Sequence, residues 1–369
     1  MNRKLLPKFL LIALSKIYGL VVTLRNRLFD WGILKQQEFD IPIVVVGNLA
    51  VGGTGKTPHT EYIINELRYT YNIAVLSRGY KRDTKGFILA SSHSSPKDIG
   101  DEPYQIYNKF NREIPVAVCE DRCHGISELQ RLYNDINLIL LDDAFQHRYV
   151  KPSVSILLTE FRRPLFYDHL LPYGNLREPI DALNRADIVI VTKCPEQIKP
   201  MDSRIFINNL KTFPYQHVLF SRFTYEQLVP LFPENCTNTP YLDWLDCEDT
   251  ILAVSGIGNP RPFIKQLKFF QFTLKTATFP DHHNFSRKDI DVILKRFNEI
   301  ESQRKYIVTT EKDAVRLMNN PYFPLELKPY IFYLPISVEF DETYNSSSFT
   351  EILIECIEKS TLKHNNYAK

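Results

Sequence analysis

The 369-residue chain lacks a disulfide framework and a marked excess of charge of either sign. Its six cysteines follow no regular spacing, which indicates a reducing compartment rather than a secreted disulfide scaffold. Cys119, Cys123 and His124 resemble metal ligands, but no fourth ligand follows at short spacing, so ordinary structural roles are favoured. The net charge of +2 carries little information, because acids and bases nearly cancel.

The N-terminal region also lacks a long unbroken apolar run. A membrane-spanning helix requires about 20 apolar residues, and Lys8 and Lys16 interrupt the apolar residues here. No small-residue cleavage site follows, so a secretory signal peptide is not expected. Residues 5–28 instead carry apolar side chains at helical spacing, which predicts an amphipathic helix. The first thirty residues have one acid, Asp30, and a group of bases: Arg3, Lys4, Lys8, Lys16, Arg25 and Arg27.

Two interpretations of the N-terminal helix remain open. The favoured one is a helix that lies in the interface of an anionic membrane, because aromatic and basic residues flank its apolar face. The other is a helix that packs on the core of the protein itself.

The strongest motif is a glycine-rich stretch that follows the apolar run 41–46 and precedes a helical pattern at 56–67. It consists of Ala50, Val51, Gly52, Gly53, Thr54, Gly55, Lys56 and Thr57. Glycines let backbone N–H groups approach phosphate oxygens, Lys56 reaches the outer phosphates, and the Thr57 hydroxyl can bind Mg²⁺. Ala50 stands where the strict motif has glycine, which costs little because the later residues make the phosphate contacts. The stretch predicts a nucleoside triphosphate site.

Alternating strand and helix patterns follow this phosphate loop and predict a parallel sheet. The expected strands are 73–77, 116–120, 138–142, 154–159 and 188–192, and the expected helices are 103–110, 122–133 and 195–210. A polar, proline-rich stretch at 230–250 precedes a second run, with strands at 251–254, 272–278, 306–309 and 331–334. We therefore predict an α/β protein: a P-loop-containing doubly wound parallel sheet, a second, smaller α/β domain and an N-terminal amphipathic helix. The predicted domains are 1–35, 36–215 and 216–369.

Asp142 and Asp143 end one of the apolar strands. Carboxylates at this edge of a parallel sheet would lie beside the phosphate loop, where they can hold Mg²⁺ directly or through water. Two other classes of phosphate-loop protein are disfavoured. Residues 192–195 begin like the guanine-reading motif of GTPases but end in Pro195, and Val51 stands where the partitioning ATPases carry a second lysine.

With these motifs in place, the chain resembles the tetraacyldisaccharide 4'-kinases, which phosphorylate a lipid A precursor at the inner membrane. The resemblance lies in ordered segments spread over most of the chain: 46–49, 52–58, 76–80, 100–103, 142–147, 176–178, 254–258, 281–283 and 310–315. Two departures are Ala144, where the family usually has glycine, and residues 173–175, where it more often reads Ala-Gly-Pro.

The resemblance implies roles for individual residues. Asp101 would be the base on the sugar hydroxyl and His282 its partner, although the residues alone favour Asp101 as a helix cap. Between the adjacent histidines 282 and 283, the family motif favours the first. The expected metal ligands are Thr57, Asp142, Asp143, Glu102 and Gln146. Arg177 and His147 are expected to bind substrate, Arg177 through the phosphate already on the disaccharide, although an ion pair between Arg177 and Glu178 is an equal alternative.

The implied activity is transfer of the γ-phosphoryl of ATP, with Mg²⁺, to the 4'-hydroxyl of tetraacyldisaccharide 1-phosphate. The expected partners are the acylated disaccharide lipid and the cytoplasmic face of a bacterial inner membrane; neither a nucleic acid nor an obligate protein partner is expected. Two alternatives are a switch ATPase that acts at the membrane and a kinase of a soluble sugar.

Overall fold

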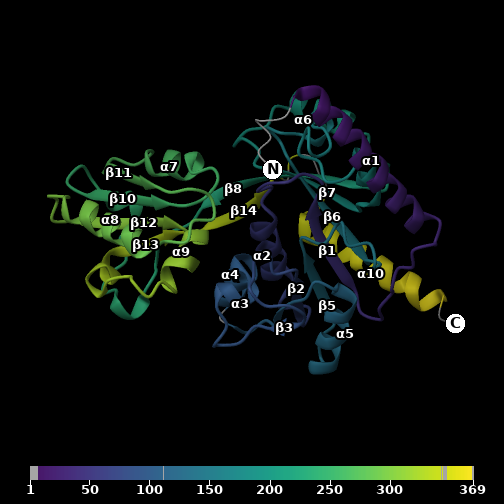
Figure 1. Ribbon diagram of the computed structural model, residues 1–369, viewed down its shortest axis with the longest axis horizontal. Helices are drawn as coiled ribbons and strands as arrows, with labels where there is room; N and C mark the ends of the chain where they lie inside the picture. Colours follow the sequence, from purple (N-terminus) through teal and green to yellow (C-terminus); the bar gives the residue numbers. More distant parts are fainter. Residues whose placement is uncertain (1–6, 111, 342, 344–346, 368–369) are drawn as a thin grey trace.

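The larger of two α/β units is built on a nine-stranded sheet (Figure 1). The computed structural model describes residues 7–110, 112–341, 343 and 347–367. From edge to edge the strands are β14 (Ile336–Phe340), β8 (His217–Tyr225), β7 (Ile188–Thr192), β6 (Val154–Glu160), β1 (Ile43–Asn48), β5 (Leu138–Asp142), β2 (Ile73–Ser77), β4 (Val116–Val118) and β3 (Ile88–Leu89). The edge strands β14 and β3 pair antiparallel with their neighbours, and all other pairs are parallel.

Helices cover both faces of this sheet, as a doubly wound fold requires. They are α1 (Lys8–Asp30), α2 (Lys56–Leu67), α3 (Pro96–Ile99), α4 (Asp101–Lys109), α5 (Arg122–Leu132), α6 (Pro200–Leu210) and α10 (Phe349–Tyr367). Because side chains alternate along a strand, Val44 and Val46 of β1 join the apolar core under α2, α4 and α10. Ile43 and Val45 join the core under α5 and α6.

The smaller unit has a five-stranded sheet that is parallel except at one edge. Its order is β11 (Thr273–Thr278), β10 (Thr250–Ser255), β12 (Lys305–Thr310), β13 (Ile331–Leu334) and β9 (Val229–Pro230), of which β9 is antiparallel. Its helices are α7 (Arg261–Leu267), α8 (Arg287–Asn298) and α9 (Glu311–Met318). The predicted α/β class, with its phosphate loop and second α/β unit, is confirmed.

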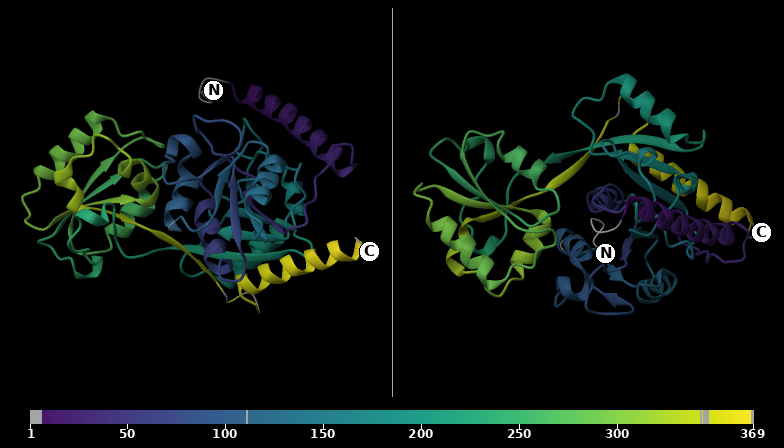
Figure 2. Two further views of the ribbon diagram at one scale, coloured as in Figure 1. Left: turned by 90° about the horizontal axis from the view of Figure 1, so that it is seen from below. Right: turned by 45° about the horizontal axis from the view of Figure 1, so that its top comes forward.

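Two antiparallel strands, β8 and β14, connect the units (Figures 1 and 2). The structure corrects the predicted second domain, 216–369, because β8, β14 and α10 all belong to the larger unit. The chain leaves the larger sheet through β8, builds the smaller unit and returns through β14. Helix α10 then packs against α2 and β6, where Leu353 and Ile357 enter the apolar core.

Smaller differences concern the ends of elements. The helix expected at 195–210 begins at Pro200, a residue favoured in the first helical turn because its missing N–H has no helical partner. The strand expected at 116–120 ends at Val118. The N-terminal helix begins at Lys8, and the basic positions Arg3 and Lys4 lie outside the described residues.

Helix α1 has two chemically different faces. Polar groups of one face contact the larger unit: Ser15 donates to the Leu170 carbonyl at 2.8 Å and Asn26 donates to the Glu178 carboxylate at 2.8 Å. The other face exposes large apolar side chains, which include Phe9, Ile17, Leu20, Val21 and Leu24. Among the described residues, α1 is the one helix that passes as a membrane span by length and composition alone, even with Lys8 and Lys16 in it.

Candidate active site

The phosphate loop connects β1 to the N-terminus of α2. Gly52 and Gly55 have positive φ angles of 118° and 94°, a backbone region that glycine enters without strain. A Cβ at Gly55 would lie 2.5 Å from Cζ of Phe223, so this position also lacks room for a side chain. The Thr54 hydroxyl accepts from the Asn48 amide at 2.8 Å, and the Thr54 carbonyl accepts from the Thr192 hydroxyl at 2.8 Å. The loop is thus fixed from two strands, with the N-terminus of α2 oriented for an anion.

Lys56 and Thr57 begin α2, and Asp142 and Asp143 end β5, next to β1 in the sheet. The Lys56 ammonium lies 3.6 Å from the Asp143 carboxylate, and the Asp142 carboxylate accepts from the Thr60 hydroxyl at 3.0 Å. Burial, and then the charge of Asp143, raises the pKa of Asp142 to about 6. Two adjacent carboxylates whose charge is incompletely compensated, beside a threonine hydroxyl, form a donor set that suits Mg²⁺.

The other two predicted metal ligands have protein partners. Gln146 donates its side-chain amide to the Asn48 carbonyl at 2.7 Å, which places Gln146 at the end of β1. Glu102 lies 2.9 Å from the Lys312 ammonium of the smaller unit. Burial raises the pKa of Glu102, but the charge and hydrogen bond of Lys312, a backbone hydrogen bond and the charge of His282 together lower it below its usual value. The Glu102 charge also contributes to the raised pKa of Asp142, so these carboxylates belong to one electrostatic environment.

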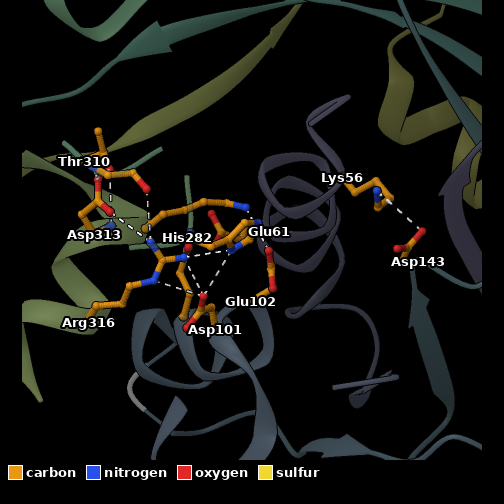
Figure 3. A network of polar contacts seen from close by, with 12 residues as sticks. Lys56, Glu61, Asp101, Glu102, Asp143, His282, Thr310, Asp313 and Arg316 are labelled. Atoms are coloured by element: carbon orange, nitrogen blue, oxygen red, sulfur yellow. Dashed lines mark hydrogen bonds and ion pairs between the residues drawn. The ribbon is translucent and has the colours of Figure 1, made fainter. Parts of the chain in front are cut away.

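The predicted pair of Asp101 and His282 is assembled across the two units (Figure 3). Asp101 begins α4 of the larger unit, and His282 lies in the smaller unit between β11 and α8, with a positive φ of 56°. Nδ1 of His282 is 3.7 Å from Oδ2 of Asp101, which is longer than a direct hydrogen bond. The Arg316 guanidinium contacts both side chains, at 2.6 Å from the carboxylate and 3.1 Å from the imidazole.

The neighbouring His283 has a structural environment. Its Nε2 lies 3.0 Å from the carboxylate of Asp289, which caps the N-terminus of α8, and its ring stacks on Phe279. The geometry therefore separates the two histidines: His282 lies at the junction between the units, and His283 lies within the smaller unit.

Arg177 contacts the phosphate-loop group rather than its neighbour in sequence. Its guanidinium is 3.3 Å from the Asp143 carboxylate, whereas Glu178 is buried and pairs with Arg185 at 2.5 Å. The alternative ion pair between Arg177 and Glu178 is therefore not formed. The Tyr18 hydroxyl of α1 donates to the Arg177 carbonyl at 2.7 Å, so the N-terminal helix supports this segment directly.

His147 lies in a positively charged environment. Burial, followed by the charge of Arg122, lowers its pKa to about 4, so its imidazole is neutral at physiological pH. The potential ligand atoms of His147, Asp121 and Cys123 lie within 4.8 Å of one another. The sequence analysis considered Cys119 and His124 beside Cys123, and neither belongs to this group. The Asp121 carboxylate already caps α5, accepting from two backbone N–H groups.

Arg316 and Lys312 are the residues of this junction that the sequence reading missed. Both lie on α9, and the sequence singles out the segment 310–315 only through the family resemblance. They are four positions apart, so they lie on one face of the helix, where they contact the acidic Asp101 and Glu102. Two bases at helical spacing are therefore the feature of the sequence that could have pointed to these contacts. Nothing in the sequence identifies which face is directed at α4.

Comparisons with known proteins agree over most of both units. A family model described as tetraacyldisaccharide-1-P 4'-kinase matches residues 7–357. Tetraacyldisaccharide 4'-kinases of Bacteroides thetaiotaomicron and Bacteroides fragilis are 48% and 49% identical, over 95% and 94% of this chain and 93% and 92% of the relatives. The crystal structure of LpxK from Aquifex aeolicus in complex with ATP is similar with a TM-score of 0.73 and 27% identity, and covers 95% of this chain and 99% of that one.

A pH dependence of stability follows from His59 of α2. Its fully buried ring bonds the Gly55 carbonyl through Nδ1 at 2.7 Å and the Ser221 hydroxyl of β8 through Nε2 at 2.8 Å. Burial lowers the pKa of His59 to about 4. Because the unfolded chain takes up this proton first, the stabilisation is complete above about pH 6.5 and is lost as the pH falls towards 4.

We therefore expect the His59→Asn variant to lose less stability than the wild type between pH 6.5 and 4, by about 3 kcal/mol of unfolding free energy. Urea unfolding at a series of pH values measures this difference. The matched control, His93→Asn, replaces an exposed histidine and should keep the wild-type slope. Equal slopes for the wild type and His59→Asn would contradict the assignment.

Proposed function

The chain belongs to the tetraacyldisaccharide-1-phosphate 4'-kinase family, and from this premise we propose how its residues divide the work of the reaction. The protein is an ATP-dependent kinase of lipid A biosynthesis that phosphorylates the 4'-hydroxyl of the tetraacyldisaccharide 1-phosphate. Mg²⁺ accompanies ATP in this reaction and neutralises part of the triphosphate charge. The contribution of individual residues is inferred from their geometry.

We assign nucleotide binding to the phosphate loop, residues 50–57. Its backbone N–H groups and the Lys56 ammonium would surround the β- and γ-phosphates. Thr57, Asp142 and Asp143 would hold the metal, with Glu102 and Gln146 as additional ligands. The observation behind this assignment is the position of Lys56, which begins α2 within 3.6 Å of the carboxylate that follows β5.

Activation of the acceptor is assigned to Asp101. The 4'-oxygen attacks the γ-phosphorus, the bond from that phosphorus to the β,γ-bridging oxygen breaks, and the Asp101 carboxylate takes the hydroxyl proton. His282 supports the carboxylate from the smaller unit. The single observation that carries this mechanism is the approach of Asp101 and His282 across the junction between the units.

Relative motion of the units would complete the site. In Figure 3, Lys56 and Asp143 lie apart from the group around Asp101, with α2 between them in this view. Two strands of the larger sheet, β8 and β14, connect the units, so a small change at these strands would move the smaller unit relative to the phosphate loop. We propose that ATP and acceptor bind with such a closure, which brings the γ-phosphoryl to the hydroxyl.

The acceptor would approach from the side of α1. Arg177, which α1 supports through Tyr18, offers a guanidinium for the phosphate already present on the disaccharide. His147, neutral at physiological pH, would contribute hydrogen bonding nearby. The exposed apolar face of α1 would lie in the interface of the cytoplasmic leaflet of the inner membrane, where an acylated sugar resides.

The activity is tested with γ-labelled ATP, Mg²⁺ and detergent-dispersed tetraacyldisaccharide 1-phosphate. The wild type should transfer label to the lipid, and Asp101→Ala should lower kcat about 10²- to 10⁴-fold, because it removes the general base. Glu113→Ala, which removes an exposed carboxylate of the same unit, should leave the rate unchanged. Consumption of ATP without labelled lipid would instead support a switch ATPase.

Membrane association is tested by substitutions on the exposed face of α1. Leu20→Glu combined with Leu24→Glu should reduce flotation with anionic phospholipid vesicles, because it places charges where apolar side chains would enter the interface. These substitutions keep the contacts that the opposite face makes with the larger unit. A deletion of the helix would remove those contacts as well. Activity on detergent-dispersed acceptor should stay within about twofold, since the exposed face makes no contact with the site.

The control for this experiment is Leu132→Glu, which introduces the same charge at an exposed leucine of α5. It should float like the wild type. Unchanged flotation of the α1 variant would show that the apolar face does not mediate membrane binding.

A further inference from the structure

Arg316 of α9 joins the two members of the proposed acceptor-activating pair. Its Nη2 donates to Oδ2 of Asp101 at 2.6 Å, its Nε donates to the same oxygen at 3.2 Å, and Nη2 also lies 3.1 Å from Nδ1 of His282 (Figure 3). The side chain of Arg316 is only 7% exposed, so water screens these contacts poorly. One guanidinium therefore links a residue of the larger unit to a residue of the smaller unit.

The opposite edge of the guanidinium is fixed by the smaller unit. Nη1 of Arg316 is 3.1 Å from Oδ1 of Asp313, whose other oxygen accepts from the Gly256 N–H and from the Thr310 hydroxyl, both at 2.8 Å. Asp313 is fully buried, and burial raises its pKa. Removal of Arg316 would leave this carboxylate without its cation, so the guanidinium has one strongly favoured position.

The chemistry of arginine restricts what this residue can do. A guanidinium stays protonated and has no acceptor, so Arg316 cannot take the proton of the sugar hydroxyl. Because it donates to Nδ1 of His282, that nitrogen is an acceptor and the ring proton lies on Nε2. Arg316 thus sets both the orientation of the Asp101 carboxylate and the tautomer of His282.

Other contacts hold the same two helices together without contact to either member of the pair. The Tyr104 hydroxyl of α4 donates to the Asn319 side chain at 3.2 Å, and Lys109 of α4 lies 2.8 Å from Glu311. The junction would therefore persist without Arg316. What would be lost is the fixed relation between carboxylate and imidazole.

We propose that Arg316 is a positioning residue of the phosphoryl transfer, which holds the Asp101 carboxylate and the His282 imidazole in their working orientation across the junction. The proposal rests on the role proposed for Asp101. It also explains why the pair, at 3.7 Å, is connected although no direct hydrogen bond joins its members.

The test compares the full-length wild type with Arg316→Ala, Arg316→Lys and Tyr104→Phe, using kcat and the two KM values with ATP and detergent-dispersed acceptor. Arg316→Ala should lower kcat about 100-fold, because a misplaced base loses its alignment, while both KM values stay within about threefold. Arg316→Lys should restore only part of the rate, to about tenfold below the wild type, since an ammonium lacks the planar fork that serves both partners. Tyr104→Phe should stay within about twofold.

Three outcomes would overturn the proposal: a kcat of Arg316→Ala within about threefold of the wild type, a loss confined to KM, or a full rate for Arg316→Lys. If thermal unfolding shows that Arg316→Ala does not fold, the folded lysine variant decides alone. Asp101→Ala distinguishes failure of the base from failure of the positioning role. A full rate for Asp101→Ala would refute the base itself, whereas a lost rate there combined with a retained rate in Arg316→Ala would refute only the role of Arg316.

Discussion

The contact between Asp101 and Arg316 is the interaction on which the site depends most. It is a charge-assisted hydrogen bond of 2.6 Å between α4 of the larger unit and α9 of the smaller one. Exposed ion pairs contribute little, but this one is partly buried and is fixed from behind by Asp313. It places a carboxylate of the larger unit against the imidazole of the smaller one.

The connection between the units is also in contact with the glycine-rich phosphate loop. Strand β8 carries Ser221, which bonds His59, and Phe223, which packs against Gly55 of the phosphate loop. Phe340 of β14 also lies in edge contact with the ring of His59. Both connecting strands therefore pack on the first turns of α2. A displacement of the phosphate loop on nucleotide binding would reach these two strands, about which we propose that the smaller unit moves.

Much of this architecture could be predicted from the sequence, because buried parallel strands are continuous apolar runs. β1, β2, β5 and β7 appear where such runs occur, and the phosphate loop follows β1 as expected. The return of the chain through β14 could not be predicted, since its partner residues in β8 lie more than 100 positions away. For the site, residue types and strand ends predict the proximity of Lys56 and Asp143. The family resemblance predicts the pairing of Asp101 with His282. Neither the residue pattern nor the resemblance predicts the role of Arg316, because contacts between units depend on how the two folds pack together.

The central claim is that Asp101 and His282 act together although they come from different units. A double-mutant cycle in kcat tests it most directly, with Asp101→Ala, His282→Ala and the double variant assayed on ATP and the tetraacyldisaccharide acceptor. If the two residues act as one group, the double variant should be no slower than Asp101→Ala within about threefold. Losses that multiply would show that the residues act independently, and the account of a shared, two-unit site would be contradicted.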